Sequence, residues 1–166
     1  MKLRLPWAKP KHNYWILLAS ILIAQLTGAI GSFFTLSAIP AWYATLTKPF
    51  FSPPNWVFGP VWTLLYTLMG ISAYLVWHKY QFGKKSRPYW QAYGTQLALN
   101  ALWSILFFGF KWVGVALLEI IAMWYFIYRS ISAAKKIDAY SAYLLYPYLA
   151  WVSFAALLNA AILLLN

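Results

Sequence analysis

Five long runs of apolar residues follow one another along the chain, separated by short polar segments. The runs cover about residues 13–39, 56–77, 90–108, 113–131 and 142–165. Each can cross a bilayer as a helix, because a span needs roughly 20 mainly apolar residues. The first run has no small-residue cleavage site and is longer than a signal-peptide core, so we expect it to be retained. The pattern predicts an all-α integral membrane protein, a single five-transmembrane-helix bundle over residues 13–166, preceded by a basic tail at residues 1–12.

The composition agrees with a surface that faces lipid. Hydrophobic residues make up 63% of the 166 residues, above the roughly 45–50% of soluble domains. The chain has only 13 Lys or Arg and 2 Asp or Glu, too few to cover a soluble domain of this size. It has no cysteine, which excludes disulfides and cysteine-based zinc or iron–sulfur sites. The composition therefore excludes an ordinary soluble enzyme and a second soluble domain.

The basic residues alternate along the chain in a way that predicts its orientation. Eleven of the thirteen lie in the tail, after the second run, or at the end of the fourth: Lys2, Arg4, Lys9, Lys11, Lys79, Lys84, Lys85, Arg87, Arg129, Lys135 and Lys136. Lys48 and Lys111 lie in the other two loops. Cytoplasmic segments are enriched in Lys and Arg, so we expect a cytoplasmic N-terminus and a C-terminus on the opposite side. The net charge of +11 thus indicates topology and contact with lipid headgroups, and no nucleic-acid partner.

Prolines predict irregular backbone in two places. Four of them lie between the first two runs: Pro40, Pro49, Pro53 and Pro54. Because proline fixes φ and aromatic residues stand beside these positions, we expect a semi-rigid, extended cover lying on the bundle. Pro147 lies inside the fifth run, where it should bend the helix and free a backbone carbonyl.

Polar and aromatic side chains recur on particular faces of the predicted helices. The third run carries, at spacings of three and four, Gln96, Asn100, Trp103, Ser104 and Phe107. The fifth carries at every fourth position Pro147, Trp151, Ala155 and Asn159, and the second adds Trp62, Tyr66 and Gly70. With the predicted orientation, these faces meet in the half of the membrane away from the cytoplasm, on the side of the proline-rich loop. We hypothesise an aromatic-walled cavity there, with the loop as its lid.

Each of these features also has a purely structural interpretation. Polar side chains on buried faces hold helices together by hydrogen bonds of around 0.6 kcal/mol each. Glu119, the one acid within a run, is either a group that relays a proton or pairs with a ligand, or a structural carboxyl. Small residues recur every four positions at Ser20, Ala24, Gly28 and Ser32. We interpret them as an intramolecular packing stripe in preference to a dimer seam.

The sequence lacks the usual arrangements of catalytic residues. His12 and His78 fall at predicted cytoplasmic ends, no run contains a pair of carboxylates, and no Gly-rich phosphate loop precedes a helix. We therefore expect no conventional hydrolysis, phosphoryl transfer or metal catalysis, no metal site and no resident cofactor.

Several motifs together resemble the translocator protein family, also called the tryptophan-rich sensory protein or peripheral benzodiazepine receptor family. The first group runs from the loop into the second run: Lys48-Pro49, Phe51, Pro53-Pro54, Trp56-Val57-Phe58-Gly59-Pro60-Val61-Trp62, Tyr66 and Met69-Gly70. The second group lies in the third and fifth runs: Leu99-Asn100, Trp103-Ser104, Phe107-Phe108-Gly109, Pro147-Tyr148-Leu149-Ala150-Trp151, Phe154-Ala155 and Leu158-Asn159. The resemblance covers all of the chain except the N-terminal tail.

The resemblance implies a membrane receptor or translocator that binds porphyrins and other flat hydrophobic ligands, linked to their transport or sensing. It implies a homodimer in a bacterial cell membrane and a ligand site lined by Phe51, Trp56, Asn100, Trp103, Ser104, Trp151 and Ala155. A sterol ligand is not expected, because the chain ends at Leu163-Leu164-Leu165-Asn166 without the Tyr-plus-basic tail of animal members. Two alternatives stay open: an enzyme that degrades porphyrins with light or oxygen, and a structural partner of other membrane proteins.

Overall fold

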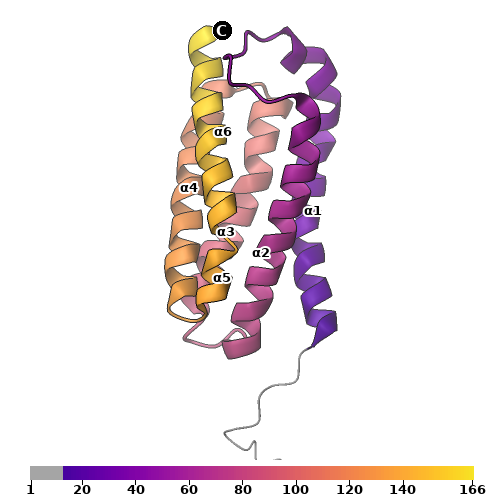
Figure 1. The fold of residues 1–166 in the computed structure, drawn as a ribbon. Coiled ribbons are helices and arrows are strands. Elements are labelled where there is room, and N and C mark those ends of the chain that lie inside the picture. Colours follow the sequence, from indigo (N-terminus) through magenta and orange to yellow (C-terminus); the bar gives the residue numbers. More distant parts are fainter. Residues whose placement is uncertain (1–12) are drawn as a thin grey trace, which may run out of the picture.

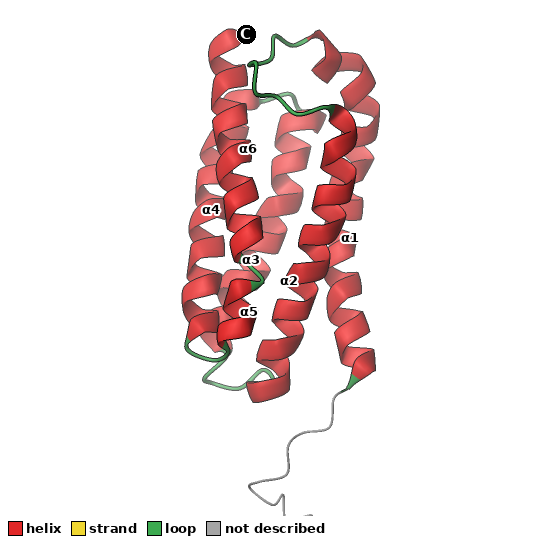
Figure 2. Cartoon of the chain, viewed as in Figure 1, coloured by secondary structure: helices red, strands yellow, loops and turns green. Residues whose placement is uncertain are grey.

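The computed structural model describes residues 13–166, and helices account for nearly all of this range (Figures 1 and 2). The first two spans are α1 (Tyr14–Ala38), extended by a π-helical turn (Ile39–Tyr43), and α2 (Phe58–Tyr80), preceded by a 3₁₀ turn (Asn55–Val57). The others are α3 (Arg87–Ser104) with a π-helical turn (Ile105–Gly109), α4 (Val113–Lys135), and the pair α5 (Ala139–Tyr143) and α6 (Tyr146–Leu165). The described residues contain no strand. The predicted all-α bundle of five spans is confirmed.

The third span is the most polar of the five. By length and composition, four helices of the described range can cross a membrane, and Arg87–Gly109 is not among them. Its polar side chains turn inward: Gln96 and Asn100 are both buried, and α3 packs against α1 and α4. Because those groups face other helices and not lipid, the low hydropathy of α3 is compatible with a place inside the bundle.

The fifth span is interrupted where the sequence predicts only a bend. α5 ends at Tyr143 and α6 begins at Tyr146, so two residues break the helix just before Pro147. Pro147 thereby lies in the first turn of α6, where its missing N–H costs least. The two pieces lie end to end (Figure 1), and each packs against α4.

The proline-rich loop crosses one end of the bundle, from the π-helical turn after α1 to the 3₁₀ turn before α2 (Figure 2). The Thr47 N–H donates to Asn166 Oδ1 at 2.9 Å, and Asn166 Nδ2 donates to the Thr47 carbonyl at 3.0 Å. Ser52 N–H closes a turn on the Pro49 carbonyl at 3.0 Å. These bonds tie the loop to the C-terminal end of α6 and hold it over this end of the bundle.

Glycines allow α1 and α2 to approach each other closely. A Cβ at Gly70 would collide with the backbone of Ile21, and one at Gly28 would collide with the ring of Tyr66. Ala24, from the same small-residue stripe as Gly28, is fully buried. The intramolecular interpretation of the stripe therefore holds for these two positions.

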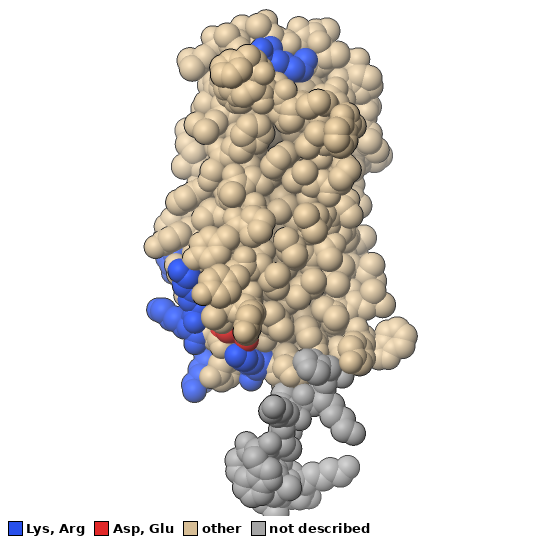
Figure 3. Space-filling view, in the orientation of Figure 1, with Lys and Arg blue, Asp and Glu red and all other residues tan. Residues whose placement is uncertain are grey.

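Most of the charged residues visible in Figure 3 gather at the end of the bundle opposite the loop, and one basic side chain lies at the loop end. At the end opposite the loop, Lys79 Nζ lies 2.6 Å from Asp138 Oδ2, and Asp138 caps α5 by accepting a hydrogen bond from the Ser141 N–H at 2.9 Å. Burial disfavours ionisation of Asp138, but hydrogen bonds from Lys79 and the backbone outweigh it, so the pKa of this carboxyl lies below its usual value. The basic residues of the predicted tail lie outside the described residues.

Candidate functional site

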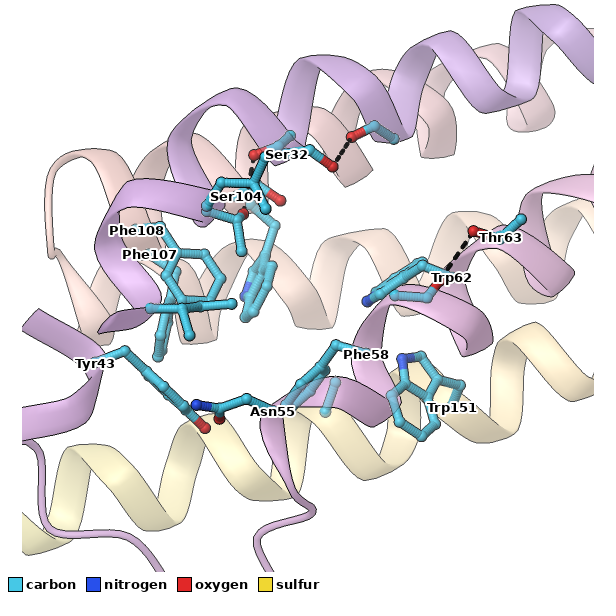
Figure 4. A pocket seen from close by; sticks show the side chains of 18 of the residues that line it. Ser32, Tyr43, Asn55, Phe58, Trp62, Thr63, Ser104, Phe107, Phe108 and Trp151 are labelled. Carbon is cyan, nitrogen blue, oxygen red and sulfur yellow. Dashed lines mark hydrogen bonds between the residues drawn. The ribbon is translucent and has the colours of Figure 1, made fainter. Parts of the chain in front are cut away.

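A cavity of about 640 Å³ occupies the half of the bundle below the loop (Figure 4). Side chains of α1, α2, α3 and α6 and of the adjoining turns line it, and α4 contributes none. This volume lies within the roughly 300–1,000 Å³ typical of small-molecule sites. The cavity is therefore large enough for a small organic ligand.

Aromatic rings make up much of the cavity wall. Trp62 stacks on Tyr66, with ring centres 5.4 Å apart, and Trp103 stacks on Phe107 at 5.0 Å. Phe58 meets Trp151 edge-on at 6.0 Å. Figure 4 shows Trp62, Phe58 and Trp151 on one side of the cavity and Tyr43, Phe107 and Phe108 on the other. Such paired rings give a flat ligand faces and edges to pack against.

Hydrogen bonds across helices fix several of these rings. The indole N–H of Trp103 donates to Asn159 Oδ1 at 3.2 Å, and Asn159 Nδ2 donates to the Val113 carbonyl at 2.9 Å. These two bonds link α3, α6 and the start of α4. Trp103 is therefore positioned before any ligand arrives, which lowers the entropic cost of binding.

Trp151 differs from Trp103 because its donor is unused. Its indole nitrogen is buried and has no hydrogen-bond partner among the described residues. A buried N–H without an acceptor costs free energy, so a ligand oxygen or nitrogen that reached it would recover that cost.

Five of the seven predicted site residues line the cavity: Trp56, Trp103, Ser104, Trp151 and Ala155. Asn100 lies outside the lining, in the core, where it accepts a hydrogen bond from the hydroxyl of Tyr66 and donates Nδ2 to the Tyr148 hydroxyl at 3.0 Å. It supports the cavity wall from behind, because Tyr66 lines the cavity and the Tyr148 ring packs against Trp62, which also lines it.

Phe51 also lies outside the lining. Its ring packs edge-on against Phe154 at 6.2 Å and is 39% exposed. The middle of the proline-rich loop adds nothing to the wall; the two turns that flank it do, through Tyr43, Asn55 and Trp56. The loop is a cover over the bundle end whose flanks, and not its centre, face the cavity.

The α1 side of the cavity is absent from the predicted site. Most of its residues are small, namely Gly28, Ala29, Gly31, Ser32 and Thr35, and Gln25 and Leu36 complete it. A Cβ at Gly31 would stand 2.8 Å from Ser104 Oγ, so glycine here keeps α1 close to α3. In the sequence, only the stripe of small residues at every fourth position, which contains Gly28 and Ser32, points to this wall. The same stripe is equally expected where two helices simply pack together.

Glu119 is not part of the cavity. It is buried on α4, and neither carboxyl oxygen has a hydrogen-bond partner among the described residues. Across residues 13–166, no group of three His, Cys, Asp or Glu side chains could hold a metal ion. The cavity thus offers stacking surfaces and a few hydrogen-bond donors and acceptors.

Comparisons with known proteins identify the relatives of this chain. The sequence profile of the TspO/MBR family matches residues 20–165. The tryptophan-rich protein TspO of Archaeoglobus fulgidus is 47% identical over 93% of this chain and 99% of its own length. The human translocator protein is 38% identical over 87% of each chain. The tryptophan-rich sensory protein of Cereibacter sphaeroides is 36% identical over 92% of each chain.

These matches run nearly end to end, and they agree with the helical bundle and the apolar helices described above. The names of the relatives indicate a receptor- or translocator-like role at a membrane. The chain is a multi-pass integral membrane protein and belongs to the TspO/MBR family.

Proposed function

We propose that this protein binds porphyrins and related flat hydrophobic molecules in the aromatic cavity, and that binding serves their transport or sensing. The observation that carries the proposal is the 640 Å³ cavity walled by stacked and edge-on rings. Burying apolar ligand surface there contributes about 25 cal/mol per Å², and ring contacts add roughly 0.5–1.5 kcal/mol each.

The polar groups around the cavity fit a ligand with a flat apolar body and acidic edges. Lys48 Nζ lies 4.8 Å from the centre of the Tyr43 ring, and Tyr43 lines the cavity. A porphyrin carries carboxylates on an apolar macrocycle, so its acids would pair with Lys48 while the macrocycle lies among the rings. The unused indole N–H of Trp151 would bind an acceptor on the ligand.

The test is a titration of the purified protein in detergent with protoporphyrin IX. We measure quenching of tryptophan fluorescence together with the porphyrin Soret band. Saturable quenching with a stable Soret band supports binding. The dimethyl ester of protoporphyrin IX keeps the macrocycle but has no free carboxylates. It should bind more weakly than protoporphyrin IX if Lys48 pairs with those carboxylates.

The same titration separates the alternatives. Loss of the Soret band under illumination would indicate a porphyrin-degrading enzyme. No saturable quenching would contradict the proposal and favour a structural partner of other membrane proteins.

A further inference from the structure

A second, smaller cavity lies at the charged end of the bundle, far from the aromatic one. It has a volume of about 140 Å³ and lies between the segment that enters α3 and the last turns of α4. Its lining consists of Lys85, Pro88, Arg129, Ser132, Ala133 and Lys136. Three cations from two segments distant in the sequence therefore surround one small hollow, which we call the basic pocket.

The chain supplies no counter-charge for this pocket. It has two acidic residues in all. Asp138 pairs with Lys79 at 2.6 Å, and Glu119 is buried in the first third of α4, ten residues before Arg129. Like charges held close together repel one another, so an anion from outside the protein would stabilise this arrangement.

The cations of the pocket keep donors available for such an anion. Arg129 gives one N–H to the Tyr125 hydroxyl at 2.7 Å, and a guanidinium has five. Lys85 Nζ lies over the Tyr80 ring, 5.3 Å from its centre, a contact that leaves its N–H groups able to donate. Ser132 adds a hydroxyl to the lining.

The neighbouring side chains place the pocket at the level of the lipid headgroups. Trp124 and Tyr128 stack on the outside of α4, with ring centres 6.0 Å apart, and lie five residues and one residue before Arg129. Exposed Trp and Tyr mark the interface between bilayer and water. Further along α4 toward the loop end, Leu118 and Ile121 are exposed and offer an apolar surface to acyl chains.

We propose that the basic pocket binds the phosphate group of an anionic phospholipid, with its acyl chains along the exposed face of α4. Arg129 can contact two phosphate oxygens at once, and Lys85 and Lys136 pair with the remaining charge. Basic pockets between spans are a known way to hold anionic headgroups. The pocket has room for a phosphate group, and the apolar face beside it distinguishes a lipid from free phosphate.

The cations at this end also have a simpler explanation: basic residues anywhere in the cytoplasmic loops help to orient the spans. That explanation makes no distinction between cations that line the pocket and neighbouring cations that do not. Lipid binding in the pocket does, so two sets of variants separate the explanations. The triple variant Lys85→Gln/Arg129→Gln/Lys136→Gln empties the pocket of charge. The matched triple Lys84→Gln/Arg87→Gln/Lys135→Gln removes the same charge from neighbouring positions that do not line it.

The experiment compares the natural protein with both triples in detergent micelles doped with phosphatidylglycerol or phosphatidylcholine, counting retained lipid by native mass spectrometry. We expect the pocket triple to lose about tenfold or more in phosphatidylglycerol affinity, since each cation near the headgroup adds to the attraction for an anionic lipid. The matched triple should lose much less. Arg129→Gln alone should give an intermediate loss, which keeps the test decisive if the pocket triple folds poorly.

Three outcomes would overturn the proposal. Equal losses in the two triples would show that only the overall charge attracts lipid. Equal retention of phosphatidylglycerol and phosphatidylcholine would show that the anion is not recognised. Displacement of phosphatidylglycerol by millimolar inorganic phosphate would show a site for free phosphate instead of a lipid.

Discussion

The two halves of the bundle differ in how α2 contacts the fifth span. In the half near the charged end, α2 meets the fifth span through α5: Ser72 Oγ lies 2.8 Å from Ser141 Oγ and 3.1 Å from the Tyr89 hydroxyl. In the half below the loop, α2 meets α6 through aromatic rings that line the cavity, such as Phe58 edge-on against Trp151. Most of the contacts between α2 and the fifth span are with the short α5.

The same bundle therefore combines a closely packed half with a hollow half. In the packed half, the hydroxyl groups of Ser72, Tyr89 and Ser141 form hydrogen bonds that join α2, α3 and α5. The break before Pro147 separates the bonded α5 from α6, and bulky rings keep the other half open. Hydroxyl contacts thus close one half of the bundle, and the space for a ligand lies in the other.

The largest effect should come from removing a ring of the hollow half. Trp151→Ala or Trp103→Ala should weaken protoporphyrin IX binding by roughly 1–3 kcal/mol, through lost stacking and packing. Trp112→Ala is the matched control, because Trp112 stacks on Phe110 outside the cavity. Fluorescence titration measures all three, and equal losses would mean that the cavity is not the site.

A smaller effect, on stability and not on binding, should come from the closed half. Ser72→Ala removes both hydroxyl contacts and leaves Tyr89 with one bond fewer, at a cost of about 1 kcal/mol in the free energy of unfolding. Thermal unfolding in detergent measures the loss. Ser37→Ala, at an exposed position of α1 outside the cavity lining, serves as control. A change in porphyrin affinity as large as that of Trp151→Ala would contradict the division into two halves.

Acid should loosen the closed half through Asp138. Its pKa is lower in the folded protein than in the unfolded chain, so the unfolded chain takes up the proton more readily. The stabilisation is complete above the unfolded pKa of about 4 and is lost as the pH falls through the folded pKa. Asp138→Asn should remove this part of the pH dependence, measured by thermal unfolding between about pH 3 and 7. An unchanged profile would show that the pair with Lys79 adds nothing.

The smallest expected effect concerns porphyrin chemistry. Light- or oxygen-dependent degradation would need an oxidisable ring near the ligand; Trp151 lines the cavity, whereas the loop carries Phe51. A phenyl ring is harder to oxidise than an indole and has no N–H, and Phe51 lies outside the cavity lining. The Soret band should therefore bleach slowly or not at all under illumination, and faster in Phe51→Trp. Rapid bleaching by the natural protein that Trp151→Phe abolishes would support the enzyme.

The sequence predicts the bundle well because membrane helices depend on local hydropathy. It also finds the faces of α3 and α6, since Trp103 and Trp151 are large, recurrent and easy to detect. It misses the α1 wall because Gly31 and Ser32 bear no side chain that signals recognition. Asn100 shares a helical face with Ser104, and only the positions of Tyr66 and Tyr148 show that it bonds in the core. The cytoplasmic N-terminus remains a prediction.

The most direct test of whether porphyrins bind in the aromatic cavity is to fill the cavity with an added side chain while keeping every aromatic ring of its wall. Ala155 lines the cavity on α6, and Ala155→Phe would place a ring in the empty volume. Leu157→Phe, on the exposed side of the same helix, is the control. We predict that Ala155→Phe weakens protoporphyrin IX binding about tenfold or more with no fall in melting temperature, because a hollow site accepts added volume. Unchanged affinity in Ala155→Phe would show that the ligand binds elsewhere.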